Sequence, residues 1–145
     1  MKQQNTELSY YELSLIAFLR ESHPELSNSR RLIKSRSEAA STAYEEAFRD
    51  GNNTQECIDI ANRTLYKGLH FSKYDTILNI LWTEFSADIH VDIVPEVALE
   101  LTKSLKELFN QYELTDDFAY SADYQTLYTE LVGAIQLKLE EYGKL

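Results

Sequence analysis

Apolar residues recur at steps of three and four along almost the whole sequence, and this spacing is typical of amphipathic α-helices. One run steps 3, 4, 3, 4 in the manner of a heptad seam: Ala98, Leu101, Leu105, Leu108 and Tyr112. The 145 residues include only 4 glycines and 2 prolines, too few for a turn-rich all-β fold. We therefore predict an all-α fold, a compact bundle of about six helices that forms one domain over residues 1–145.

Two helix starts carry a capping box, in which a polar N-cap residue is followed three positions later by an acid. The first is Ser9-x-x-Glu12 and the second is Asn53-x-x-Glu56. The helix after Ser9 has apolar residues on two faces, so we expect it to be buried on more than one side.

Residues 88–94 interrupt the helical spacing. Their sequence, DIHVDIV, alternates isoleucine and valine with polar residues, and a period of two is typical of extended chain with one side against a core. Because a lone strand would have no partner in a sheet, we predict an extended linker near 88–94 rather than a strand.

The chain is strongly acidic, with 14 basic and 24 acidic residues and a formal net charge of −10. Such a charge repels phosphate backbones and anionic lipid surfaces, so we expect no direct binding of nucleic acid. One basic cluster is a possible phosphate contact: Arg30, Arg31, Lys34 and Arg36. The alternative is that this cluster is a solvated helix face that pairs with acids elsewhere.

Cysteine usage and hydropathy indicate a compartment. A single cysteine, Cys57, cannot form an intramolecular disulfide, which suits a reducing environment. The first residues contain no apolar segment of a secretory signal, and no apolar run approaches the roughly 18 residues that a membrane span needs. We expect a cytoplasmic protein that does not bind membranes.

No motif in the sequence predicts catalysis, a metal or a cofactor. Glu84, Asp88, His90 and Asp92 include suitable metal ligands, but their spacing matches no known binding loop. Cys57 lies within an apolar stripe, where a buried structural role is expected, and the nearest histidine, His70, lies beyond a glycine. Asp116 and Asp117 fit helix capping, and no phosphate-binding glycine loop is present. We expect no enzymatic activity.

Tyrosine is the most unusual feature, with 10 residues in the chain. Tyr120, Tyr124 and Tyr128 are four residues apart and would share one helical stripe, while Tyr10 and Tyr11 stand near the start of the first helix. Tyrosine has an apolar ring and a polar tip, which suits both core edges and protein interfaces. The five residues are therefore a possible interaction surface, and the alternative is the rim of the protein's own core.

Three blocks of sequence resemble a family of small, uncharacterised all-helical proteins found mainly in Bacteroidetes. They are ELSYYELSLIAFLRESHPEL, GLHFSKYDTILNILWTEF and YELTDDFAYSADYQTLYTELVGAIQLKLEEYG, and the resemblance runs from about Glu7 to Gly143. The resemblance implies a helical fold and a setting in conjugative-transposon-like DNA. It implies no activity, ligand or catalytic residue.

Three functional hypotheses follow. The first is a non-enzymatic interaction or accessory protein of a bacterial mobile element, which acts through a surface for a protein partner or a second copy of itself. The second is an acidic decoy of DNA that occupies a DNA-binding protein. The third is an enzyme whose site is assembled from distant residues such as Asp88, His90 or Cys57.

Overall fold

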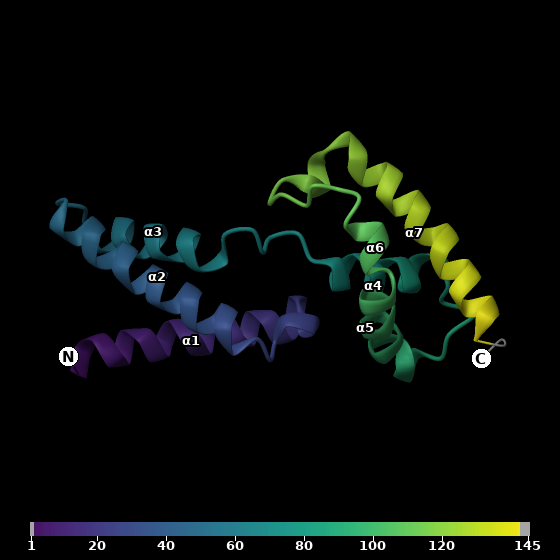
Figure 1. Cartoon of the computed structure of the whole chain (residues 1–145), viewed down its shortest axis with the longest axis horizontal. Helices are drawn as coiled ribbons and strands as arrows, with labels where there is room; N and C mark the ends of the chain where they lie inside the picture. Colours follow the sequence, from purple (N-terminus) through teal and green to yellow (C-terminus); the bar gives the residue numbers. More distant parts are fainter. Residues whose placement is uncertain (1, 143–145) are drawn as a thin grey trace. The chain divides into compact units, whose positions relative to one another are not determined.

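The computed structural model describes the backbone of residues 2–142 and the side chains from residue 8 onward, and its regular structure is entirely helical (Figure 1). The all-α prediction is therefore confirmed. The described residues form seven α-helices: α1 Lys2–Ser22, α2 Arg30–Arg49, α3 Thr54–Tyr66, α4 Lys73–Glu84, α5 Val94–Ser104, α6 Lys106–Phe109 and α7 Ala122–Glu141. Three short 3-10 helices accompany them: Pro24–Leu26, Val91–Ile93 and Phe118–Tyr120.

Internal contacts divide the chain into two compact units. The N-terminal unit comprises the residues up to Glu21 together with Leu26–Leu69, and the C-terminal unit comprises Ser22–Glu25 together with the chain from His70 onward. Each unit has its own cluster of buried apolar side chains. That the chain forms one domain over residues 1–145 stays a prediction.

In the N-terminal unit, α2 and α3 form a hairpin whose helices approach closely because the facing residues are small (Figure 1). Ala40 and Ser37 on α2 and Ala61 and Cys57 on α3 are fully buried. Gly51 allows the tight turn between the helices because its φ of 91° is strained for other residues. The core of this unit is completed by larger side chains from α1 and the helix ends: Tyr11, Leu15, Leu19, Ile33, Leu65 and Leu69.

The helix starts show which capping prediction was right. The Asn53 side chain accepts a hydrogen bond from the Glu56 N–H, and the Glu56 side chain accepts one from the Asn53 N–H, as the capping box predicts. The box at Ser9 is wrong as a helix start, because α1 begins at Lys2 and Ser9 lies inside it.

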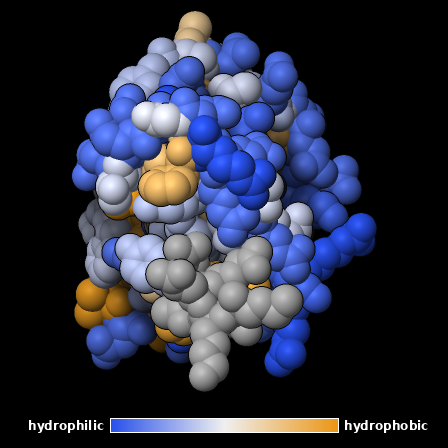
Figure 2. Space-filling view, turned by 90° about the vertical axis from the view of Figure 1, so that its left-hand side faces the viewer, coloured by the Kyte–Doolittle hydropathy of each residue, from blue (hydrophilic) through white to orange (hydrophobic). Residues whose placement is uncertain are grey.

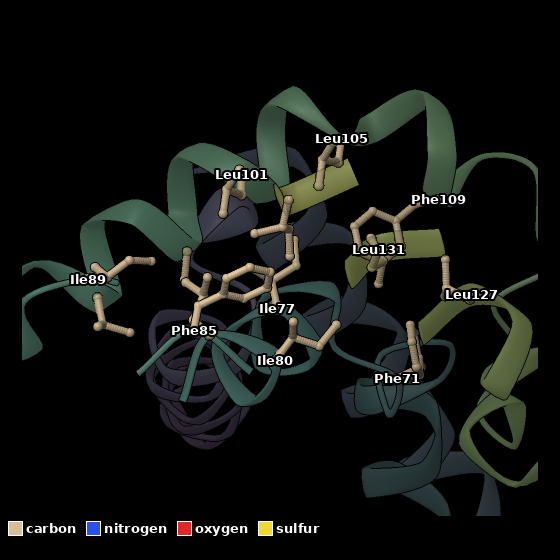
Figure 3. Packing of buried hydrophobic residues seen from close by; sticks show 14 of the residues in the cluster. Phe71, Ile77, Ile80, Phe85, Ile89, Leu101, Leu105, Phe109, Leu127 and Leu131 are labelled. Carbon is tan, nitrogen blue, oxygen red and sulfur yellow. The ribbon is translucent and has the colours of Figure 1, made fainter. Parts of the chain in front are cut away.

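The core of the C-terminal unit lies between α4, α5 and α7 (Figure 3). Phe109 on α6 is its largest fully buried side chain, and Leu101, Leu127 and Leu131 pack in the same cluster. The predicted heptad seam points into this core, although the helix is interrupted at Leu105, between α5 and α6.

The predicted extended linker near 88–94 is wrong in its local conformation. Residues 91–93 form a 3-10 turn, and α5 already begins at Val94. Ile89 is buried, whereas Val91 is 57% exposed, so the alternating pattern does not mark one buried side. Extended backbone without a neighbouring strand leaves its polar groups unpaired, whereas this turn lets the Ile93 N–H donate to the His90 carbonyl.

Candidate functional site

The three spaced tyrosines do not form one helical stripe. Tyr120 ends the 3-10 turn before α7, and Ser121 at the N-cap has extended backbone that breaks the helical phase. Tyr120 is 91% exposed, whereas Tyr124 and Tyr128 on α7 are partly buried. The prediction of a continuous stripe through Tyr120, Tyr124 and Tyr128 is therefore wrong.

Tyr124 and Tyr128 form part of the rim of the C-terminal core. The ring of Tyr124 lies 6.3 Å from that of Phe71 and 6.4 Å from that of Phe118, measured between centroids. The Tyr128 hydroxyl donates to a Glu84 carboxylate oxygen at 3.1 Å. The pKa of Tyr128 is raised, mainly by partial burial of the hydroxyl and secondly by this hydrogen bond. These contacts give both tyrosines a structural role within the unit.

Tyr112 has the most perturbed of the described tyrosine hydroxyls. It donates to the Glu130 carboxylate, and this hydrogen bond raises the pKa of Tyr112 to about 12. Because the folded pKa lies above the ordinary value of 10, the bond stabilises the fold below pH 10, and this contribution is lost as the pH rises through about 12. We expect Tyr112→Phe to remove the latest-titrating phenol from an ultraviolet absorbance titration. Glu130→Gln keeps this phenol but should lower its pKa toward 10. Unchanged curves would contradict the assignment.

Tyr10 and Tyr11 differ although they are neighbours. Tyr11 is 7% exposed and belongs to the N-terminal core, whereas Tyr10 is 66% exposed. Leu13, at 68%, and the exposed Ala17 follow Tyr10 at helical steps of three and four. Tyr10, Leu13 and Ala17 form an apolar strip that is exposed to solvent, and we call it the α1 ridge. The expectation that this helix is buried on more than one side is wrong for this face.

The basic cluster is divided by the fold. Arg36 turns toward α3, where its Nη1 donates to the carbonyl oxygens of Leu65 at 3.2 Å and Thr64 at 3.4 Å. The last carbonyls of a helix have no partner within it, so Arg36 caps the C-terminal end of α3. Arg36 is partly buried in this role, whereas Arg30, Arg31 and Lys34 are exposed. A phosphate contact by the four residues stays a prediction.

The capping role of Arg36 predicts a stability effect. We expect Arg36→Gln to lower the free energy of unfolding by about 1.5 kcal/mol, because two carbonyls lose a charged donor. Arg31→Gln, on the same helix but exposed, is the matched control and should change stability by less than about 0.5 kcal/mol. Urea unfolding followed by circular dichroism measures both, and equal effects would show that Arg36 has no special role.

A hollow of about 590 Å³ lies in the N-terminal unit where α1 and α2 meet. Its floor includes Ile16 and Ile33, and three cations line it: Arg20, Arg30 and Lys34. None of the three forms an ion pair with another residue in the described part of the chain. Ser27, Asn28 and Glu12 complete the lining, whereas Arg31 does not take part. Sequence reasoning missed Arg20, because only the fold brings it to the α2 residues.

Formal charge is distributed unevenly between the units. The N-terminal unit contains nine basic and nine acidic residues, whereas the C-terminal unit contains five basic and fifteen acidic ones. The acidity of the whole chain therefore comes from the C-terminal unit. The N-terminal unit, which contains the hollow, has a formal charge of zero, so its net charge does not repel an anionic partner.

The other residues considered for chemistry do not converge. His90 accepts a hydrogen bond from the Asp92 N–H at 3.2 Å, and within the described residues no three His, Cys, Asp or Glu side chains form a group that could hold a metal. Cys57 is fully buried, as predicted for a structural role. Oδ1 of Asp116 accepts from the His70 N–H at 3.1 Å and lies 3.0 Å from Nδ1 of His70.

His70 and Ser72 both line a shallow second hollow, an arrangement that invites comparison with a nucleophile and base. The Ser72 hydroxyl, however, donates to the Ser22 carbonyl and accepts from the Asp75 N–H at 2.9 Å, at the start of α4. This hydroxyl is used as a helix cap, so the arrangement provides no nucleophile.

The chain belongs to the family described as a domain of unknown function, DUF1896, which matches residues 3–144. Among solved structures it is similar to protein PG0816 from Porphyromonas gingivalis, with 37% identity and a TM-score of 0.91 over 100% of this chain and 99% of that one. No curated protein matches it. No helix among the described residues has both the length and the apolar character needed to cross a membrane.

Proposed function

We propose that this protein is a non-enzymatic interaction protein that binds a protein partner through the face of its N-terminal unit formed by α1 and the start of α2. The observation that carries the proposal is the α1 ridge, where Tyr10 and Leu13 are 66% and 68% exposed. On the face shown in Figure 2, hydrophilic residues predominate and hydrophobic ones form small separate patches. An apolar strip along one helix that stays exposed to water is typical of a binding site.

The ridge and the basic hollow are neighbours on the same helix. Leu13 and Arg20 are seven residues apart, so they lie on nearly the same side of α1. Interfaces commonly combine an apolar centre with a charged rim, and this face offers both. The role in a mobile element is part of the proposal and is supported by the resemblance of the three sequence blocks.

Two exposed leucines allow a matched test. Leu13 on α1 is 68% exposed and Leu137 on α7 is 65% exposed, so an aspartate at either position should be tolerated by the fold. We expect Leu13→Asp to lose a partner that the unaltered protein and Leu137→Asp both retain in pull-downs from native cells. Light scattering after size-exclusion chromatography identifies a second copy as that partner. Retention of every partner by Leu13→Asp would contradict the proposal.

The acidic excess of the C-terminal unit favours a second candidate, a decoy of DNA. A decoy needs carboxylates in an ordered row, whereas acidic residues here occur on α4, α5, α6 and α7 alike. The interaction protein is therefore the better supported function. A decoy would release DNA from a DNA-binding protein of the host in a competition assay, and the interaction protein would not.

A further inference from the structure

We infer that the hollow between α1 and α2 binds a short acidic peptide segment of a protein partner. This segment carries an apolar side chain beside its carboxylates. The inference rests on the proposed function and specifies the chemistry of the partner. The volume of about 590 Å³ lies within the range of ligand sites and is much larger than one small anion needs.

The cations of the hollow are concentrated at one end. Arg20 is in the last turns of α1, and Arg30 and Lys34 are in the first turns of α2, so all three lie near the connection between the helices. Glu12 is eight residues before Arg20, which places its backbone about 12 Å further along α1. Carboxylates are therefore attracted to the connection end and repelled from the Glu12 end, which favours one direction for a bound segment.

The floor of the hollow explains why a peptide fits better than a free anion. Ile16 lies between Glu12 and Arg20 on the same side of α1, and Ile33 lies between Arg30 and Lys34 on α2. Ile33 is buried and Ile16 only partly so. A phosphate ion bound to the cations leaves the exposed part of Ile16 in water, whereas an apolar side chain next to a carboxylate covers it. The exposed cations supply attraction that weakens as ionic strength rises.

The test uses a phage library of random peptides, selected on the full-length protein. We expect selected peptides to be enriched in aspartate and glutamate next to an apolar residue, and to bind about tenfold more weakly to Arg30→Glu and Lys34→Glu. Arg31→Glu is the matched control: it changes the net charge equally, is on the same turn as Arg30 and does not line the hollow. Arg31→Glu should bind the selected peptides as tightly as the unaltered protein.

Several results would overturn the inference without touching the proposed function, which is tested separately with Leu13→Asp. They are no acidic enrichment, equal losses for Arg30→Glu and Arg31→Glu, or binding of inorganic phosphate that depends on Arg30 without any peptide binding. Self-association that Arg30→Glu abolishes would assign the hollow to a second copy and would also overturn it. Circular dichroism of each variant confirms that the fold is retained.

Discussion

Phe109→Ala is expected to destabilise the C-terminal unit by about 3–5 kcal/mol, because it removes a fully buried aromatic ring and leaves a cavity that neighbouring side chains fill only in part. The ring packs in the main apolar cluster of this unit, and the Lys73 ammonium lies 5.8 Å from its centroid. The alanine variant loses both contacts.

The measurement for Phe109→Ala is urea unfolding followed by the fluorescence of Trp82, the single tryptophan of the chain, which lies on α4 in the same unit. Tyr120→Ala is the matched control, because Tyr120 lies in the same unit and is 91% exposed, so its removal should change stability by less than about 0.5 kcal/mol. A loss below about 1 kcal/mol for Phe109→Ala would mean that Phe109 is not packed as described.

Ala40→Leu is expected to destabilise the N-terminal unit by about 1–3 kcal/mol. Ala40 is completely buried where α2 packs against α3, and three added heavy atoms require either an unfavourable rotamer or a separation of the helices. Two buried serines on the same helix, Ser37 and Ser41, have hydroxyls without a hydrogen-bond partner among the described residues.

The neighbouring residue provides the control for Ala40→Leu. Ala39 is exposed on the same helix, and leucine is nearly as good a helix former as alanine, so Ala39→Leu should change stability by less than about 0.5 kcal/mol. Circular dichroism during thermal unfolding compares the two variants. Equal melting temperatures would show that the close approach of α2 and α3 is not required.

The parts of the fold that the sequence predicted correctly depend on interactions close in the chain. The apolar spacing defines the helices, and caps such as that of Asn53 involve residues three positions apart. The same pattern failed at Ser9, because a capping motif inside a continuous helix does not start it. The four-residue spacing of the tyrosines failed at Tyr120, because Ser121 has extended backbone and residues before it are out of phase with α7.

The candidate site was predictable only in part. Arg30 and Lys34 stand out in the sequence as basic residues without nearby acids, and Tyr10 stands out as an aromatic near the start of a helix. The inclusion of Arg20 and the exclusion of Arg36 depend on packing between helices, since Arg36 reaches carbonyls 28 and 29 residues away. No local pattern contains that information.

The most direct test of the account is photo-cross-linking in native cells from a benzoylphenylalanine placed at position 13, with position 137 as the comparison. Both positions carry an exposed leucine, one on the α1 ridge and one on α7. We predict a discrete cross-linked protein adduct from position 13 that is absent from position 137. No adduct from position 13, or the same adducts from both positions, would contradict the proposal that this protein acts through the face of α1.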